Sequence, residues 1–344
     1  MTRLAVVADD LTGALDASAP FAARGLSTVV ALGLGDLKVT VASGADVVGV
    51  STDSRDIPPD AARQAVADCI AMLPPDLPIF KKIDSRLKGN IAAELDAISF
   101  ERALVIPAIP AFGRWMRQGR LEGFGVASPI DIASRLGSHA ACATIPDIDE
   151  QGDIDHAIAT MAHELPVGAR GLAEALAKRL APVKTRPVLP QVSAPAFYVI
   201  GSTDPITALQ VERLRAAVEV TYIEAPDGEA PDVLPSLGAL TMLRATQGSG
   251  AGAALVAQRL GDTLVRLRPP AGATLVLSGG ATAQVVLRTL GIGILELAGE
   301  ALPGVPIARA GGFTIITKSG GFGEPDALLR LLGHLGEPER GEEG

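Results

Sequence analysis

Short apolar segments alternate with longer amphipathic ones along most of the chain. Buried parallel strands read as continuous apolar runs, whereas helices that cover a sheet repeat their apolar positions every three to four residues. The alternation therefore predicts an α/β fold. In the first half we expect strands at Leu4–Ala8, Ser27–Leu32, Asp46–Ser51, Ile79–Ile83 and Ala103–Ile106, and helices at Ala14–Arg24, Asp60–Met72, Ile91–Ile98, Ile154–His163 and Gly171–Leu180.

The alternation stops in the proline-rich stretch Ala181–Pro195 and then restarts. Such a stretch is typical of a linker, and 344 residues exceed what one hydrophobic core usually supports. We therefore expect two domains, residues 1–185 and 190–344, each a mainly parallel sheet flanked by helices. In the second we expect strands at Ala196–Ile200, Val220–Glu224, Thr274–Leu277 and Thr314–Thr317, and helices at Thr207–Ala217, Gly250–Leu267 and Thr282–Leu290.

One segment of the first domain, Ile106–Gly125, has neither the apolar pattern of a buried strand nor that of a helix. It is rich in proline and glycine and holds the only tryptophan, Trp115. Long irregular segments in compact domains are usually functional loops or lids. We expect such a loop here, carrying the basic residues Arg114, Arg117 and Arg120.

The composition argues against a nucleic-acid-binding protein, a membrane protein and a disulfide-rich protein. With a net charge of −9 and 3% aromatic residues, the chain lacks the basic field and stacking surfaces that nucleic-acid binding requires. No apolar run reaches the roughly 20 residues of a membrane helix, and there is no signal-peptide pattern. The two cysteines have no metal-site or disulfide spacing. We expect a cytoplasmic protein without nucleic-acid or membrane partners.

The first chemical motif follows the first strand. Two carboxylates, Asp9 and Asp10, stand where that strand ends, and Thr12 and Gly13 open the next helix. Ligands of open α/β sheets bind at this edge, where a carboxylate can accept a hydroxyl proton and helix N–H groups can hold an anion. The alternative is that Asp10 or Thr12 simply caps the helix.

The second motif, KKIDSRLKGN, follows the strand at Ile79–Ile83. Here Lys82, Asp84, Ser85 and Arg86 combine cations with hydrogen-bond acceptors. Such a mixture suits a substrate with a carboxylate and several hydroxyls. The alternative is a solvated basic turn.

Three glycine loops follow strands of the second domain, and each has the same design. They are Gly201-Ser202-Thr203, Ser278-Gly279-Gly280-Ala281-Thr282 and Lys318-Ser319-Gly320-Gly321-Phe322-Gly323. Glycines allow the backbone to approach a phosphate, and the following helices offer N–H donors. Lys318 could add a positive charge beside the transferred phosphoryl group. The alternative is ordinary turns.

Several common motifs are absent from the sequence. There is no G-x-x-x-x-G-K-[ST], and no G-x-G-x-x-G follows the first strand, which disfavours a P-loop and a standard dinucleotide site. The four histidines have no metal-ligand spacing, so the metal ligands remain unknown.

Taken together, the motifs resemble those of the four-carbon acid sugar kinase family. ADDLTGALD, KKIDSRLKGN, IPAIPAFGRWMRQG, GSTDPITALQ, LSGGATA and KSGGFG occur in the family's order and span nearly the whole chain. The chain departs from the family at Ala281, where an acidic residue is usual. It is also shorter between Trp115 and Ile148 and after Tyr222.

The resemblance implies an N-terminal acid-sugar domain, a C-terminal ATP domain, and an active site in the cleft between them. It implies phosphorylation of threonate, erythronate, 3-oxo-tetronate or a related branched acid, with ATP and Mg²⁺. The residues implied to face the acid are Asp9, Asp10, Thr12, Gly13, Lys82, Asp84, Ser85, Arg86 and Arg114. Those implied to line the ATP are Ser202, Gly279, Gly280, Ala281, Thr282, Lys318, Gly320, Gly321 and Gly323.

The sequence therefore predicts an ATP-dependent kinase that phosphorylates a hydroxyl of a small sugar acid. Asp84 or Asp10 would accept the hydroxyl proton, Arg86 and Lys82 would hold the carboxylate, and Lys318 would steady the phosphates. Two alternatives stay open, namely a catalytically impaired ligand-binding or regulatory homologue and a dehydrogenase on a similar scaffold. A homodimer is also left open.

Overall fold

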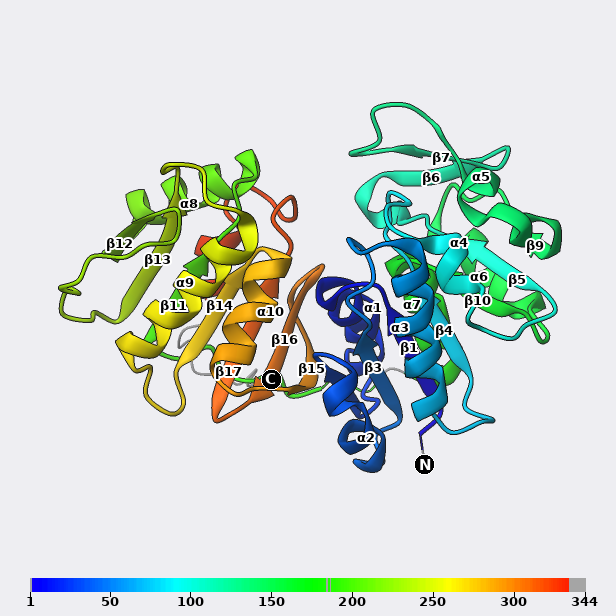
Figure 1. The fold of residues 1–344 in the computed structure, drawn as a ribbon, viewed down its shortest axis with the longest axis horizontal. Coiled ribbons are helices and arrows are strands. Elements are labelled where there is room, and N and C mark those ends of the chain that lie inside the picture. Colours follow the sequence, from blue (N-terminus) through cyan, green and yellow to red (C-terminus); the bar gives the residue numbers. More distant parts are fainter. Residues whose placement is uncertain (1, 184, 186, 334–344) are drawn as a thin grey trace, which may run out of the picture. The chain divides into compact units, whose positions relative to one another are not determined.

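The computed structural model describes residues 2–183, 185 and 187–333. The chain divides into two compact units, Met1–Pro187 and Val188–Gly344. Each unit contains a mainly parallel β-sheet with helices packed on it (Figure 1). The predicted fold class, α/β with parallel sheets flanked by helices, is confirmed.

The sheet of the first unit has the strand order β2, β3, β1, β4, β10, β5, β9, and all of these pairings are parallel. Strand β1 therefore lies between β3 and β4, and the carboxyl ends of these three strands meet at one edge. The bounds are β1 Leu4–Ala8, β2 Thr28–Ala31, β3 Val47–Ser51, β4 Ile79–Lys82, β5 Ala103–Ile106, β9 Ala143–Thr144 and β10 Leu165–Gly168.

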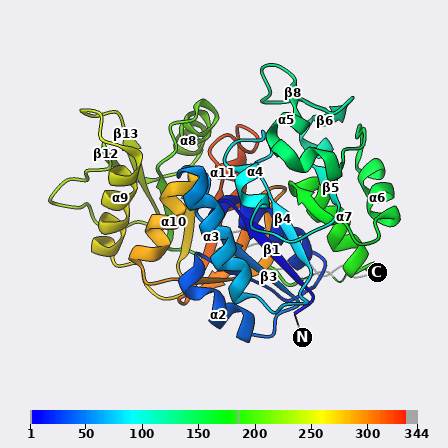
Figure 2. The same ribbon diagram turned by 45° about the vertical axis from the view of Figure 1, so that its right-hand side comes forward.

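Alternate residues of β1 enter two separate cores, one on each face of the sheet. Val6 clusters with Phe21 of α1, whereas Val7 clusters with Cys69 of α3. Figure 2 shows α2 and α3 side by side, and these two helices are in contact. Both faces are therefore covered, which explains the continuous apolar strands. The helices are α1 Leu11–Ala22, α2 Leu34–Ala42, α3 Pro59–Met72, α4 Ile91–Leu95, α6 Gln151–Thr160 and α7 Arg170–Leu180.

The segment Ile106–Gly125 is not the long irregular loop that we expected. After a 3₁₀ turn at Pro110–Phe112 it forms a hairpin of two antiparallel strands, β6 (Arg114–Arg117) and β7 (Arg120–Gly123). Gln118 and Gly119 both have positive φ, as a two-residue hairpin turn requires. A third strand, β8 (Ile130–Asp131), completes this small sheet, and α5 (Ile132–Leu136) and a 3₁₀ helix at Gly137–Cys142 follow it.

The sheet of the second unit has the order β12, β13, β11, β14, β17, β16, β15. The first five strands are parallel, and β16 runs antiparallel to both of its neighbours, β17 and β15. The strands are β11 Ala196–Ile200, β12 Thr221–Pro226, β13 Leu240–Thr246, β14 Thr274–Ser278, β15 Ile294–Leu302, β16 Val305–Ala310 and β17 Phe313–Lys318. The helices are α8 Pro205–Ala217, α9 Ala253–Leu267, α10 Gly280–Thr289 and α11 Ala327–Leu332.

Several further elements were missed at the sequence level, among them the helices α2, α5 and α11 and the strands β8, β9, β10, β13, β15 and β16. The segment that forms α2, LGDLKVTVA, is rich in β-branched residues and buries only Leu37 and Thr40, so its helical period is weak. β15 and β16 are joined by the two-residue turn Pro303-Gly304, where Gly304 has positive φ, and this Pro-Gly turn signal was overlooked.

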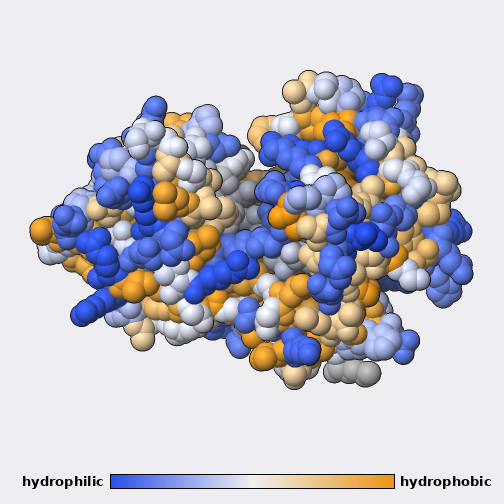
Figure 3. All heavy atoms as spheres, in the orientation of Figure 1, coloured by the Kyte–Doolittle hydropathy of each residue, from blue (hydrophilic) through white to orange (hydrophobic). Residues whose placement is uncertain are grey.

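No helix in the described ranges combines the length and apolarity that crossing a bilayer demands. On the face shown in Figure 3, hydrophilic and hydrophobic residues are interspersed over both units.

Candidate functional site

The central strands of the first unit bring two predicted motifs together. Asp9 and Asp10 follow β1, and Lys82 ends the adjacent strand β4, with Asp84 two residues later. The loop after β3, on the other side of β1, contributes Arg55. The predicted acid-sugar residues of these two motifs therefore share one sheet edge, as strand-end residues of a parallel sheet should.

Arg55 is the residue at this edge that the sequence analysis missed. Its Nε and Nη2 donate to the two carboxylate oxygens of Asp9 at 2.8 and 3.0 Å, and its Nη1 donates to Asp10 at 2.6 Å. Its Nη2 also lies 3.8 Å from Asp84 Oδ2. Burial alone would lower the pKa of Arg55, but the three carboxylates outweigh it and raise that pKa above its ordinary value.

Asp10 forms the cap of α1, the structural alternative considered above. Its Oδ1 accepts the N–H of Gly13 at 2.6 Å, and its Oδ2 accepts the hydroxyl of Thr12 at 2.6 Å as well as Arg55 Nη1. Both carboxylate oxygens are thus engaged by the protein itself. A proton-accepting role for Asp10 is correspondingly less favoured.

Asp84 is bound differently. Its Oδ1 accepts the N–H groups of Arg86 at 2.9 Å and Lys88 at 3.2 Å, which closes the loop after β4 around the carboxylate. Burial would raise the pKa of Asp84, but the charges of Arg55 and Lys82, with these two N–H groups, hold the pKa below its ordinary value. Asp84 is therefore a carboxylate at neutral pH.

Lys82 is buried beside the start of α1. Its ammonium donates to the carbonyl of Ile83 at 2.8 Å. A β-carbon placed on Gly13 would lie 3.2 Å from Lys82 Nζ, so this cation and the helix terminus are close together. Positive charge from a side chain and from a helix N-terminus therefore accumulates at one point.

Ser85, Arg86 and Arg114 form a second basic group. Arg114 Nη1 donates to Ser85 Oγ at 2.8 Å, and its Nε and Nη2 donate to the carbonyl of Phe124. A β-carbon on Gly125 would lie 3.4 Å from Arg114 Nη2 and 3.8 Å from Arg86 Cδ, so both arginines approach this glycine. Burial, and then the charge of Arg86, lower the pKa of Arg114.

The other two arginines of the hairpin are not part of this group. Arg117 is exposed and pairs with Asp149 at 2.7 Å, and Arg120 is exposed on β7. Of the predicted basic cluster, only Arg114 reaches the loops at the strand ends.

The three glycine loops of the second unit converge on one another. They follow β11, β14 and β17, which are neighbours in the sheet. A β-carbon on Gly320 would lie 2.3 Å from Ser202 Oγ, and one on Gly321 would lie 3.0 Å from Asp204 Oδ2. Gly279 adopts φ +106° and approaches Ser202 N, so no larger residue would fit there without strain.

Helix α10 begins at the middle of these loops. Its N-cap is Gly279, which has no side chain with which to bond the first N–H groups, and Ala281 in its first turn is exposed. Thr282 is buried against Gly201. An uncapped helix start among close-packed glycine loops is suited to hold an anionic group.

Lys318 faces its own loop. Its ammonium donates to the carbonyls of Ser319 and Gly320, both at 3.0 Å, and of Phe322 at 3.1 Å. Burial lowers the pKa of Lys318 to about 8, and the charge of Asp204 acts in the opposite direction. In this conformation Lys318 shapes the glycine loop, while its contact with a phosphoryl group stays a prediction.

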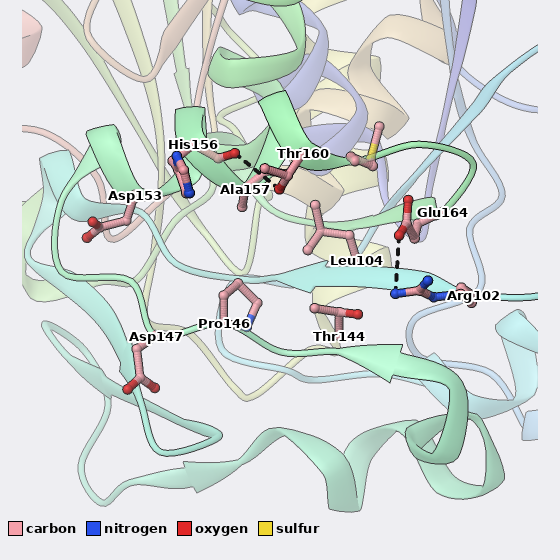
Figure 4. A pocket seen from close by; sticks show the side chains of 11 residues that line it. Arg102, Leu104, Thr144, Pro146, Asp147, Asp153, His156, Ala157, Thr160 and Glu164 are labelled. Carbon is pink, nitrogen blue, oxygen red and sulfur yellow. Dashed lines mark hydrogen bonds and ion pairs between the residues drawn. The ribbon is translucent and has the colours of Figure 1, made fainter.

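A pocket of about 400 Å³ lies elsewhere in the first unit, and none of the predicted site residues lines it (Figure 4). Its polar groups serve local structure. Arg102 pairs with Glu164 at 3.4 Å, Thr160 bonds the backbone of its own helix, and Asp153 caps α6. We therefore place the candidate site at the strand ends rather than in this pocket.

Two family models match the chain. A sugar-binding N-terminal domain matches residues 4–128, and a nucleotide-binding C-terminal domain matches residues 197–328. The chain belongs to the four-carbon acid sugar kinase family.

Named relatives of this family align over nearly the whole chain. A D-threonate kinase of Bordetella bronchiseptica is 29% identical, and the alignment covers 95% of this chain and 96% of the relative. A 3-oxo-tetronate kinase of Pseudomonas fluorescens is 25% identical, with 96% and 97% covered. Haemophilus influenzae protein HI1011 has the same fold, with a TM-score of 0.69 and 21% identity over 96% of this chain and 99% of that one.

The predictions of the family and of a kinase are thus confirmed, and the dehydrogenase alternative is set aside. The second unit contains the family's nucleotide-binding domain, and the glycine loops after β11, β14 and β17 all fall within residues 197–328. The roles of the individual residues stay predictions.

Replacing Arg55 by methionine should raise the pKa of Asp84. Among the charges that lower this pKa, Arg55 has the largest effect. Without Arg55, the rise in pKa that burial causes is less strongly opposed. Asp84 would then be protonated at higher pH, and the acidic limb of the pH profile of kcat/KM should move upward. An acidic limb that stays in place would contradict this electrostatic role. Arg63→Met, which removes an exposed cation paired with Asp60, is the matched control.

Lys318 should leave a signature in the pH dependence of stability. Its pKa is about 8 in the fold and ordinarily 10.5, so between these values the unfolded chain binds the proton that the folded chain has lost. The free energy of unfolding of the wild type, relative to Lys318→Met, should therefore rise with pH from about 8 to 10.5. Urea unfolding at several pH values checks this. Parallel curves for the two proteins would refute it, and the exposed Lys178→Met serves as the control.

Proposed function

We propose that this kinase transfers the γ-phosphoryl group of ATP to a hydroxyl of a small polyhydroxy acid, such as threonate, erythronate or 3-oxo-tetronate. The observation that carries the proposal is the cluster at the ends of β1, β3 and β4, where Asp9, Asp10 and Asp84 surround Arg55. Carboxylates bind hydroxyl groups, and the adjacent guanidinium groups of Arg86 and Arg114 suit a carboxylate.

Asp84 is the proposed proton acceptor. Its pKa is held low, so that it is ionised, and its Oδ1 is fixed by two backbone N–H groups. Within the described part of the chain, its Oδ2 has only the 3.8 Å contact with Arg55, whereas both oxygens of Asp10 are engaged by short bonds. Asp84 Oδ2 is therefore the carboxylate oxygen best placed to take a proton from a substrate hydroxyl.

Arg86 and Lys82, together with Arg114, would hold the substrate carboxylate. Arg86 and Arg114 approach the same glycine, Gly125. An anion bound there would relieve the repulsion through which Arg86 lowers the pKa of Arg114. Lys82, buried beside the start of α1, would add its charge to that of the two arginines.

In the second unit, the phosphates of ATP would lie on the glycine loops and on the start of α10. Backbone N–H groups can bind phosphate oxygens there, and Lys318 keeps the loop at Gly320–Gly323 in shape. Asp204 lies among these loops and is the carboxylate that would hold Mg²⁺. When bound, the ion would neutralise charge on the phosphates. That the reaction occurs between the two domains stays a prediction from the sequence.

Purified protein with ATP and Mg²⁺ should phosphorylate at least one acid from a panel of four- and five-carbon sugar acids. Phosphorylated product, detected by ³¹P NMR, checks this. The corresponding polyols, which lack the carboxylate, should be poor acceptors. Binding of acids without transfer to any of them would instead favour the catalytically impaired homologue.

Asp84→Asn should reduce kcat by at least about 100-fold, because the amide cannot accept the proton. The amide keeps an oxygen for the N–H groups of Arg86 and Lys88, so the fold should survive and circular dichroism should be unchanged. Steady-state kinetics against the best acid checks the prediction. Retained turnover would remove Asp84 from the base role. Asp53→Asn, an exposed neighbour in the loop after β3, is a suitable comparison.

A further inference from the structure

A fully buried ion pair lies behind the loops that form the candidate acid-sugar site. Lys81 on β4 and Glu94 on α4 are 0% and 1% exposed, and Lys81 Nζ is 2.8 Å from Glu94 Oε2. The side chain of Lys81 points away from Lys82, its neighbour on β4, as successive residues of a strand do. Neither member of the pair has a part in the chemistry proposed above.

The pair is continuous with a hydrogen-bonded network that joins three strand ends. The hydroxyl of Ser54, in the loop after β3, donates to Glu94 Oε1 at 2.5 Å. Thr52 Oγ1 lies 2.7 Å from Ser54 Oγ and 3.0 Å from the carbonyl oxygen of Ala8, the last residue of β1. Lys81 Nζ donates to the carbonyl of Lys82 at 3.0 Å. The network thus reaches the ends of β1, β3 and β4.

The loops after β1, β3 and β4 also carry Arg55 and the three carboxylates that surround it. Ser54 directly precedes Arg55, so the bond from Ser54 to Glu94 fixes the backbone from which the arginine projects. Asn90 holds the same loop from the other side, because its Nδ2 donates to the carbonyls of Ser54 at 2.8 Å and Ile57 at 2.7 Å. Arg55 therefore starts from a backbone that is held on both sides.

Stability alone does not account for this arrangement. Removing two charges from water offsets most of their attraction, and replacing a buried ion pair by apolar residues of similar volume often costs no stability. An ion pair does, however, impose a geometry that an apolar pair does not. A buried pair at this place is therefore better explained by what it orients.

We propose that Lys81 and Glu94 are a positioning pair, which holds Ser54 and thereby sets Arg55 in register with Asp9 and Asp84. The proposal rests on the proposed function insofar as Arg55 and Asp84 serve phosphoryl transfer. It makes Lys81 and Glu94 residues that act through Arg55, without contact to the acid or to ATP.

The test is the double variant Lys81→Met/Glu94→Leu, which replaces the pair by apolar side chains. We expect a folded protein whose kcat/KM for the best acid falls about 100-fold, because small misplacements of reacting groups are costly, while the KM for ATP stays within about twofold. Amide hydrogen exchange across residues 52–57 should accelerate. The surface pair Lys178–Asp155, exchanged as Lys178→Met/Asp155→Leu, should change none of these quantities.

A double variant with wild-type kcat/KM and unchanged exchange across residues 52–57 would overturn the proposal. Should that variant not fold, Ser54→Ala decides, because it removes the hydroxyl that joins Glu94 and Thr52 and leaves both charges of the ion pair in place. An approximately tenfold lower kcat/KM for the acid, with the ATP KM unchanged, supports the proposal, and unchanged kinetics overturns it. If the wild type phosphorylates no acid, the proposed function fails, whereas amide exchange in the variants still tests the positioning.

Discussion

The candidate acid-sugar site depends on one partly buried arginine, Arg55, that contacts three carboxylates. Asp9 is 2% exposed, and an isolated carboxylate at that depth would be costly. Arg55 binds both of its oxygens, reaches Asp10 as well, and lowers the pKa of Asp84. The same guanidinium group therefore makes the burial of acidic residues tolerable and lowers the pKa of Asp84, the proposed proton acceptor. It also links the ends of three adjacent strands, which no single local motif could do.

The two units carry different kinds of candidate ligand-binding groups. In the first unit, the candidate groups are ionised side chains from β-strand ends and from the hairpin, which supplies Arg114. In the second, close-packed glycines and a helix start offer backbone N–H groups, and Lys318 turns its charge inward to the loop. A net charge of −9 is compatible with both, because the positive groups act locally.

Much of this arrangement could be predicted from the sequence, for a definite physical reason. Residues that follow parallel strands lie at one sheet edge, so the local pattern could place the motifs after Leu4–Ala8 and Ile79–Ile83, and the three glycine loops, at strand ends, and the family resemblance implied that each set shares one ligand. Family resemblance supplied the kinase and the names of the acids. The position of β1 between β3 and β4 was not predictable, because strand order depends on long-range pairing.

The features that the sequence did not reveal depend on contacts between distant residues or on side-chain conformation. Arg55 lies 46 residues from Asp9, in a segment that reads as an ordinary polar turn, and only the strand order makes them partners. The direction of the Lys318 side chain is a rotamer choice that a sequence motif does not specify. The hairpin after Gly113 had a local signal, the pair Gln118-Gly119 between two short alternating strands, but the surrounding prolines and glycines obscured it.

The cluster around Arg55 is proposed to bind the sugar acid, and Asp84 to accept its proton. A crystal structure of the protein with a bound four-carbon acid would decide both points. We expect a substrate hydroxyl within hydrogen-bond distance of Asp84 and the carboxylate beside Arg86 and Arg114. An acid bound away from Arg55, or bound there with Asp84 untouched, would contradict this expectation.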